Sequence, residues 1–431
     1  MKIGLEVHAG LPTKTKLFCR CTNHSKEPNT AICPTCTGMP GSKPVLNNSA
    51  LKIAFSISKA LNCSSSKTIY FERKVYFYPD LPKSFQITQK ECPIGSNGFI
   101  LLGDKKIRIR RVQLEEDPAK IIREDGYTLI DYNRSGRPLV EIVTEPDIQT
   151  EEDLRMFITE LKSILYYLDV DVEQEIKADL NISLSEIRVE VKNITGTKNI
   201  IDAARYEIQR QEKLINENIP IEKETRSYNE AKMATISSRE KESDEEYGFI
   251  FDSDLTVYDI SKIKAIKPIY ASSMAKEYSQ KYGVNESQIL EAIQFNKNSL
   301  GFIERFEKNY KLKNILNSIS LLQRYGSKND VETLEKVIKI IEQGHYPDQK
   351  DIQAIESGKE ITINIKVANT QEIDKEIRSM IDGNKNLLKE SATNKKALNF
   401  IIGNIAKKLK VNPRLVSERL ESLLSSEHKV Q

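Results

Sequence analysis

Four cysteines near the start of this 431-residue chain constrain its fold more than any other feature of the sequence. Cys19 and Cys21 are separated by one residue, Cys33 and Cys36 by two, and eleven residues lie between the pairs. Two close pairs of thiolates are typical of a tetrahedral zinc site, and disulfide bonds are the competing interpretation. Because nothing in the sequence indicates secretion, we expect these cysteines to bind structural zinc.

A β-strand with two polar side chains on one face is predicted just before these cysteines. Apolar residues alternate with others across Ile3–His8, which is the period of a half-buried strand. Glu6 and His8 are two positions apart and therefore project from the same face. A carboxylate and an imidazole held this close can coordinate one divalent cation. Such a pair is also common on a solvated strand face, so both interpretations stand.

The composition is that of an ordinary soluble protein of two or three domains, with 39% hydrophobic and 29% charged residues. The formal net charge is only +3, so any affinity for nucleic acid must come from local patches. The N-terminus enters a strand without an apolar signal segment, and no stretch approaches the roughly 20 apolar residues of a membrane span. We therefore expect a protein of the reducing cytoplasm with no membrane contact.

Residues 1–265 predict a mixed α+β domain built on an antiparallel sheet. Its amphipathic helices are expected over residues 50–61, 151–168 and 201–216. Its strands are expected over residues 3–8, 178–184 and 187–191, with further strands from 99 to 148. Thr150 is the expected N-cap of the second helix.

The pattern becomes helical after Pro268, and we divide this part into a helical domain, residues 266–368, and a helical tail, residues 369–431. Helices are expected over 276–282, 287–295, 303–310, 314–325 and 331–342, and in the tail over 397–408 and from Asn412 onward. The tail helices carry several lysines: Lys395, Lys396, Lys407, Lys408 and Lys410. A basic helical pair can grip an RNA backbone, although such lysines can also form only a solvated face.

Aromatic and cationic residues interleave before a proline-stiffened turn in the segment 71–83. Flat rings can stack on a base, and Arg73, Lys74 and Lys83 can bind phosphate, which favours a nucleotide-binding surface. The competing interpretation is an edge strand with core tyrosines.

Acidic residues at two places in the chain are unfavourable unless they are solvated or neutralised. Glu115, Glu116 and Asp117 are adjacent at the end of a predicted strand, and they repel one another unless they are solvated or neutralised. Glu141 lies within the apolar run 139–143, where burial without a partner is costly. We expect arginine, lysine or a cation to meet Glu141.

Several longer motifs occur in a fixed order along the chain. They are I-G-L-E-V-H from Ile3, C-P-x-C-x-G-x-P-G from Cys33, F-x-R-K-x-Y-F-Y-P-D-L-P-K from Phe71, L-E-E-D from Leu114, N-R-x-G-x-P-L-x-E-I-V-x-E-P-D-I from Asn133 and E-T-R from Glu224. Together they closely resemble the B-subunit family of the tRNA-dependent amidotransferase (GatCAB). A weaker match continues to A-L-N-F-I-I-G-N-I and N-P-R-L-V in the tail, so the resemblance spans nearly the whole chain.

The resemblance implies a specific reaction and specific partners. Proteins of this family hold misacylated Glu-tRNA(Gln) or Asp-tRNA(Asn) and activate the side-chain carboxylate with ATP as an acyl phosphate. Ammonia, released from glutamine by the A subunit, then displaces the phosphate, and the pair is held together by a small C subunit. The implied fold is a catalytic cradle domain over residues 1–265, the helical domain, and a tail resembling the YqeY family that contacts tRNA.

The resemblance also implies the catalytic residues. It assigns the Mg²⁺ ligands to His8, Glu116 and Glu141, with Glu6 and Glu115 close by. The face shared by Glu6 and His8 agrees with this assignment.

The nucleotide site implied by the resemblance involves two further parts of the chain. The resemblance implies nucleotide or phosphate contacts for Lys74, Tyr76 and Tyr78. It places Asp179, Asn181 and Lys192 in the same cavity. No enzyme nucleophile is required, because the substrate carboxylate itself attacks phosphorus. We therefore expect Cys63 and Cys92 to be structural.

The chain departs from the family pattern at three places. Gln113 stands where the family usually has histidine, Gln174–Lys177 replaces most of a G-S-L-R segment, and Gly248 stands where an arginine is expected. These departures leave open an alternative: a non-catalytic, zinc-stabilised tRNA-binding relative that has lost the kinase site. A third interpretation, the related archaeal E-type protein, requires an inserted domain for which this length leaves no obvious room.

Overall fold

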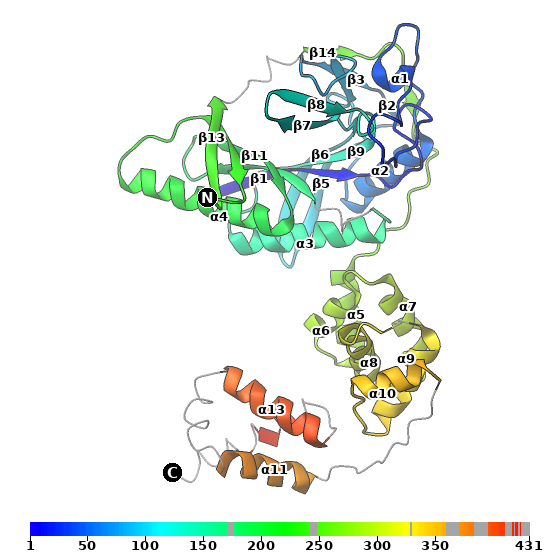
Figure 1. Ribbon diagram of the computed structural model, residues 1–431, viewed down its shortest axis with the longest axis vertical. Coiled ribbons are helices and arrows are strands. Elements are labelled where there is room, and N and C mark those ends of the chain that lie inside the picture. The colour runs from blue at the N-terminus through cyan, green and yellow to red at the C-terminus, as the bar shows by residue number, and fades with distance from the viewer. Residues whose placement is uncertain are drawn as a thin grey trace. The chain divides into compact units, whose positions relative to one another are not determined.

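The computed structural model describes residues 1–170, 176–240, 248–327, 330–358, 370–382 and 395–409, together with 416–417, 419–420 and 423. The chain forms two compact units, Met1–Ala271 and Ser272–Gln431. The first unit is mixed α and β, as predicted, and the described part of the second is helical (Figure 1).

An eight-stranded sheet organises the first unit, with strand order β13-β12-β11-β10-β1-β9-β6-β5. In that order, the strands span Ala234–Glu240, Glu224–Asn229, Val189–Thr195, Lys177–Ser183, Lys2–Gly10, Pro138–Thr144, Lys105–Glu116 and Gly95–Leu102. The strand predicted over Ile3–His8 is thus β1, which lies between β10 and β9.

The sheet is antiparallel, as predicted, except at one pair of strands. β11 and β12 run parallel, whereas the other neighbours in this sheet are antiparallel. The reason is the connection: helix α4 (Thr197–Asn216) carries the chain back between them, and a parallel pair needs such a crossover. The helix begins four residues before the predicted position 201, directly after Gly196.

Three helices pack against one face of the sheet: α2 (Asn48–Ala60), α3 (Glu151–Tyr167) and α4 (Figure 1). They bury the apolar side of β1, where Ile3, Leu5 and Val7 are at most 1% exposed. Each such side chain contributes about 1.5–3 kcal/mol when fully buried. The α3 N-cap is Thr150, as predicted, and its hydroxyl accepts from Asp153 N.

A second, three-stranded sheet, β14-β3-β4, contacts the first sheet where β4 packs against β6. Its strands are Gly248–Phe251, Glu72–Val75 and Phe85–Thr88. Because β3 lies in the middle of this sheet, the interpretation of segment 71–83 as an edge strand is wrong. The tyrosines are not in the core either, since Tyr78 is 46% exposed.

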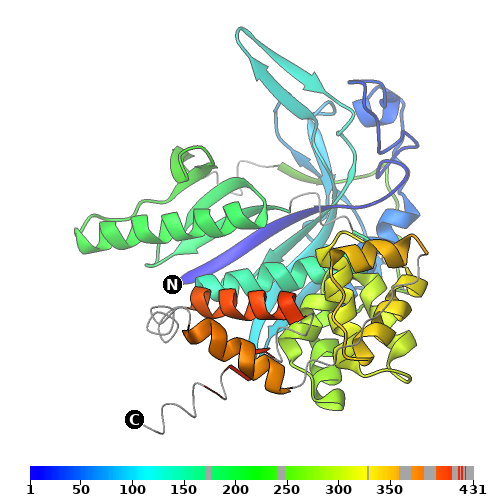
Figure 2. The same cartoon turned by 60° about the horizontal axis from the view of Figure 1, so that its bottom comes forward.

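The remaining short elements border these two sheets. Strands β7 (Lys120–Glu124) and β8 (Tyr127–Asp131) form a hairpin that projects from the first unit (Figure 2). Strands β2 (Thr68–Ile69) and β15 (Tyr258–Asp259) pair with each other, and α1 (Pro34–Thr37) is a single turn within the cysteine segment.

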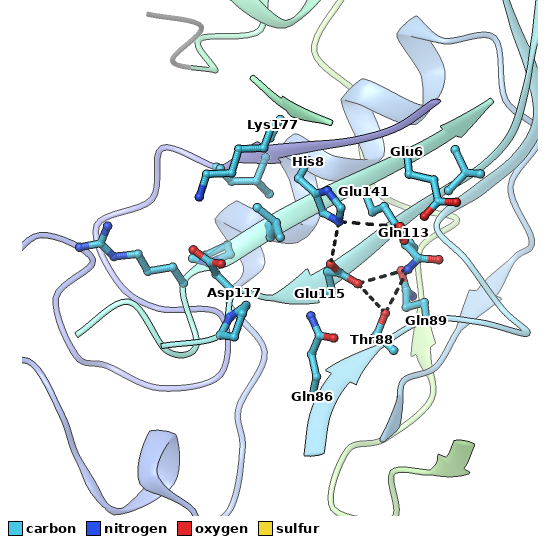
Figure 3. Close-up of a pocket in the computed structure, with 18 of the residues that line it drawn as sticks. Glu6, His8, Gln86, Thr88, Gln89, Gln113, Glu115, Asp117, Glu141 and Lys177 are labelled. Carbon is cyan, nitrogen blue, oxygen red and sulfur yellow. Dashed lines mark hydrogen bonds and ion pairs between the residues drawn. The ribbon is translucent and has the colours of Figure 1, made fainter. Parts of the chain in front are cut away.

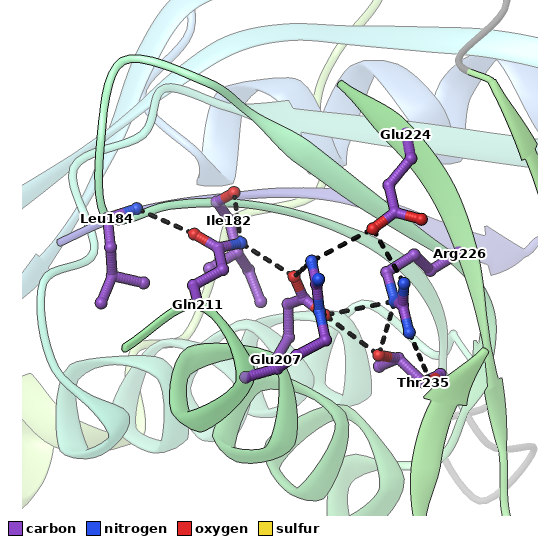
Figure 4. Close-up of polar contacts among 8 residues, drawn as sticks. Ile182, Leu184, Glu207, Gln211, Glu224, Arg226 and Thr235 are labelled. Atoms are coloured by element: carbon purple, nitrogen blue, oxygen red, sulfur yellow. Dashed lines mark hydrogen bonds and ion pairs between the residues drawn. The ribbon is translucent and has the colours of Figure 1, made fainter. Parts of the chain in front are cut away.

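A buried polar network fastens α4 to the β12–β13 hairpin (Figure 4). The carboxylate of Glu207, which is fully buried, accepts hydrogen bonds from Arg210, Gln211 and Thr235. It also lies 3.4 Å from Nε of Arg226, which belongs to the E-T-R motif. A buried carboxylate stripped of such partners costs about 3–5 kcal/mol, so this network fixes the end of the sheet.

The second unit contains helices that overlap those predicted over 276–342 and 397–408, and it also contains α10 (Gln349–Glu356), which was not predicted. Its other described helices are α5 (Ala271–Tyr282), α6 (Glu286–Ile293), α7 (Lys297–Phe306), α8 (Leu312–Arg324), α9 (Val331–Glu342), α11 (Thr370–Asp382) and α13 (Lys395–Leu409). Helix α7 begins six residues before the predicted Ile303, because Asn296 caps it by accepting from Ser299 N. None of the described helices is long and apolar enough to cross a membrane.

The division into residues 266–368 and 369–431 stays a prediction. The start of the last helix at Asn412–Pro413 lies outside the described residues.

Candidate active site and metal centres

An imidazole and two carboxylates meet on the sheet face that the three helices leave uncovered (Figure 3). His8 on β1 lies opposite Glu141 on β9, and Glu115 projects from β6 beside them. His8 Nε2 lies 3.7 Å from Glu115 Oε1 and 3.8 Å from Glu141 Oε1. Ligand atoms of the three residues all lie within 4.8 Å of one another. This nitrogen and oxygen donor set fits one divalent cation.

The electrostatics of this cluster favour added positive charge. Burial and the nearby Glu115 raise the pKa of Glu141 to about 7. Burial alone would lower the pKa of His8, but the surrounding carboxylates, Glu141 foremost, raise it above its usual value. Two carboxylates buried this close together repel each other, and a divalent cation between them removes that repulsion.

The three adjacent acids predicted to need partners each find a different one. Glu115 joins His8 and Glu141. Glu116 makes an ion pair with Lys83 and accepts a hydrogen bond from Ile87 N. Asp117 lies 3.4 Å from the guanidinium of Arg134.

The structure does not bring together the implied Mg²⁺ ligands His8, Glu116 and Glu141. Successive side chains on a strand point to opposite faces, so Glu115 and Glu116 cannot both reach the cluster. The structure brings Glu115 to His8 and Glu141, and Glu116 lies with Lys83, where both side chains are at most 8% exposed.

Glu6 lies on the same face of β1 as His8, as predicted. Its Oε1 accepts a hydrogen bond from Asn181 Nδ2 at 3.1 Å. Asp179, which lies opposite Glu6 on β10, accepts from Asn193 N at 2.9 Å, and burial raises its pKa. These residues extend the polar row from the cluster along β1 and β10.

A cavity of about 680 Å³ opens over this row. Among the residues predicted from the sequence, it is lined by Glu6, His8, Lys74, Tyr76, Glu115, Glu141 and Lys192. Asp179, Asn181, Glu116 and Tyr78 are not part of its lining. Tyr78 instead accepts a hydrogen bond from Arg123 on the β7–β8 hairpin.

Sequence reasoning missed several lining residues from the three-stranded sheet. Thr88 on β4 and Phe249 on β14 both line the cavity, and Lys90 Nζ lies 4.1 Å from the centre of the Phe249 ring. Phe249 reaches this position because β14 pairs with β3 and places it opposite Lys74. No local pattern signals a pairing between such distant segments.

The four predicted zinc ligands are brought together. The Sγ atoms of Cys19, Cys21, Cys33 and Cys36 all lie within 4.8 Å of one another, and the cysteines form no disulfide. A tetrahedral zinc ion with sulfur at about 2.3 Å needs sulfur atoms about 3.8 Å apart, so the cluster fits the ion.

Two donors support the Cys36 thiolate. Cys33 N donates to Cys36 Sγ at 3.2 Å, and Nζ of the fully buried Lys16 lies 3.6 Å from the same sulfur. A hydrogen bond from the Cys19 thiol and the Lys16 charge hold the pKa of Cys36 well below that of an ordinary thiol. A stabilised thiolate is the form that binds zinc.

Cys63 and Cys92 lie apart from this cluster. Burial raises the pKa of Cys63 to about 12, which makes its thiol unreactive. The Cys92 thiol donates to Thr68 O at 3.3 Å. Neither lines the cavity, in line with the structural role expected for both.

Comparisons with known proteins agree with one another. The family model described as the GatB/GatE catalytic domain matches residues 1–265. A relative from Saccharolobus solfataricus, named as the B subunit of aspartyl/glutamyl-tRNA(Asn/Gln) amidotransferase, is 36% identical over 474 residues, covering 98% of this chain and 99% of its own.

Two further relatives carry the same name. The protein from Caldanaerobacter subterraneus is 34% identical and covers 98% of both chains. The protein from Methanoregula boonei is 45% identical in an alignment of 269 positions that covers 59% of this chain and 56% of its own. The similarity to the first two relatives thus extends over nearly the whole chain.

Proposed function

The chain belongs to the family of aspartyl/glutamyl-tRNA(Asn/Gln) amidotransferase B subunits, and we propose that its cavity is where the side-chain carboxylate of a misacylated tRNA is activated with ATP. The substrate is Glu-tRNA(Gln), Asp-tRNA(Asn) or both. The observation that carries the proposal is the cluster of His8, Glu115 and Glu141 on the cavity wall.

The proposed reaction has two steps. An oxygen of the substrate carboxylate attacks the γ-phosphorus of ATP, a C–O–P bond forms, and the bond to the bridging oxygen breaks to release ADP. Ammonia then attacks the acyl carbon, a C–N bond forms, and phosphate leaves as the nitrogen loses a proton. Neither step needs a nucleophile from the protein, which agrees with the buried or hydrogen-bonded thiols of Cys63 and Cys92.

His8, Glu115 and Glu141 would hold a divalent cation, Mg²⁺ in this family. A bound cation screens the phosphate charges and stabilises the charge that develops during transfer. The protein's part is to keep the three ligand atoms within reach of one ion. Glu6, fixed by Asn181, adds a further carboxylate close by.

The three-stranded sheet supplies the nucleotide side of the cavity in this proposal. Lys74, Tyr76 and Lys90 line the wall, together with the ring of Phe249. Cations there suit phosphate, and an aromatic face suits a base. Lys192, which lies 3.9 Å from Glu190, lines the cavity at the other sheet.

The same membership supports the remaining parts of the proposal. Ammonia would come from an A subunit that hydrolyses glutamine, in a cytoplasmic complex that a C subunit holds together. Residues 1–265 would form the catalytic cradle, and 369–431 a YqeY-like tail that contacts tRNA. Zinc held by the four cysteines would stabilise the start of the cradle.

The test is ATP consumption by the chain reconstituted with its A and C partners, with and without Glu-tRNA(Gln) or Asp-tRNA(Asn). We expect turnover that depends on misacylated tRNA and falls at least about 100-fold in Glu115→Gln, since outer-sphere changes alone cost roughly 10–100-fold. Glu222→Gln, at an exposed loop position, serves as the control and should retain turnover. Tight tRNA binding without any turnover in the unmodified protein would instead favour the non-catalytic alternative.

A further inference from the structure

The two carboxylate oxygens of Glu115 face different partners. Thr88 Oγ1 donates to Glu115 Oε2 at 3.0 Å, and Gln113 Nε2 donates to the same oxygen at 3.2 Å. Oε1 of Glu115 faces His8 instead, at 3.7 Å (Figure 3). Oε2 is therefore bonded to Thr88 and Gln113, whereas Oε1 points into the cluster on the cavity wall, toward His8.

The side chains that hold Oε2 are themselves fixed. Gln113 and Thr88 are 6% and 2% exposed, and Gln113 Nε2 also lies 3.3 Å from Thr88 Oγ1. The three groups thus form a closed triangle between β4 and β6. A buried polar group with this many partners cannot rotate without leaving a donor or acceptor unsatisfied.

Arg111 decides which way the Gln113 amide points. Arg111 Nε donates to Gln113 Oε1 at 2.8 Å. If the amide were reversed, its NH₂ group would face the arginine donor and its oxygen would face the Glu115 carboxylate, so both contacts would be repulsive. Arg111, Gln113 and Glu115 alternate along β6 and share one face, which allows this chain of contacts.

We infer that Gln113 and Thr88 are positioning residues for the cation site: they hold Oε2 of Glu115 and thereby present Oε1 to the ion, while Arg111 fixes the Gln113 amide. This inference rests on the cation site proposed above. It gives the chain's departure from the family at position 113 a physical meaning. A glutamine supplies one donor and one acceptor in this place, as a neutral histidine also can.

The test is the affinity of the full chain, with its A and C partners, for Mn²⁺, measured from the electron paramagnetic resonance signal of the free ion. Gln113→Met removes both polar contacts at nearly constant volume, and Thr88→Val removes the hydroxyl. Each should weaken binding roughly 10–100-fold, the usual effect of losing an outer-sphere partner of a metal ligand. Gln113→His should bind within about threefold of the unmodified protein, because the imidazole retains one donor and one acceptor.

Gln211→Met is the matched control. Gln211 is also a fully buried glutamine of the first unit, and it bonds to Leu184 N, Ile182 O and Glu207. Its replacement removes comparable hydrogen bonds away from the cavity, so Mn²⁺ affinity should not change.

The outcomes separate this inference from the proposed function. If the unmodified protein shows no Mn²⁺ binding that Glu115→Gln abolishes, the proposed cation site itself is wrong. If that binding is present but Gln113→Met and Thr88→Val bind as tightly as the unmodified protein, the positioning role is wrong. A Gln113→His protein as weak as Gln113→Met would also overturn it. Should Gln113→Met fail to fold, Thr88→Val decides alone.

Discussion

The two metal-type clusters of the first unit are built in opposite ways. The cysteine cluster comes from one short segment, Cys19–Cys36, whereas the acidic cluster takes one residue from each of three strands, at positions 8, 115 and 141. The first can therefore help to fold the segment that carries it, while the second exists only once the sheet has formed. Metal should thus contribute to stability at the cysteines and to chemistry at the carboxylates.

Removing zinc should have the largest effect on stability. Structural zinc is worth about 10–16 kcal/mol in small zinc domains, so a Cys36→Ser variant should lose the ion and the order of the surrounding segment. Zinc content by atomic emission and proteolysis of residues 11–47 would show this. If the variant keeps its zinc content and its resistance to proteolysis, the four thiols do not form the zinc site.

Lys83→Met tests how much the buried ion pair of Lys83 with Glu116, which lies outside the acidic cluster, contributes to stability. It leaves Glu116 buried beside a side chain without charge, and breaking a buried pair in this way costs about 3–5 kcal/mol. Urea denaturation of the chain would measure the change. The double variant Lys83→Met/Glu116→Met should recover much of the loss. A single variant as stable as the unmodified protein would show that this ion pair does not contribute to stability.

Removing Mg²⁺ should have the smallest effect on stability. An ion that binds only the folded chain stabilises it by about 1.4 kcal/mol at ten times its dissociation constant. Thermal unfolding in buffer freed of Mg²⁺ by dialysis, set against the same scan with excess Mg²⁺, should therefore show a small shift. Equal zinc content in the two samples assigns that shift to Mg²⁺. A shift as large as that of Cys36→Ser would remove the contrast between the clusters.

Local patterns predicted the parts of the fold that depend on neighbouring residues. Alternation in Ile3–His8 predicted both the strand and the shared face of Glu6 and His8, and cysteine spacing predicted the four-sulfur cluster. Thr150 was predicted as a cap because its role depends on residues within one turn.

The position of Glu115 on the same face as Gln113, beside His8, could have been predicted from the sequence but was not. Val112 and Leu114 are buried on the helix side, so strand alternation alone assigns Gln113 and Glu115 to the other face. The resemblance instead pointed to Glu116. Side-chain periodicity is the stronger argument for a residue inside a regular strand.

Other parts depend on long-range pairing and had no local signal. The parallel pair of β11 and β12 results from how α4 crosses the sheet, and Phe249 reaches the cavity only because β14 pairs with β3. Each depends on which distant segments become neighbours, which no pattern within one segment specifies.

The most direct test of the account is Mn²⁺ binding by two variants of adjacent residues, Glu115→Gln and Glu116→Gln, in the full chain with its partners. The account predicts that Glu115→Gln loses the site and that Glu116→Gln binds within a few-fold of the unmodified protein, because its side chain lies with Lys83 on the opposite face of β6. Loss of binding in Glu116→Gln with binding retained in Glu115→Gln would contradict it.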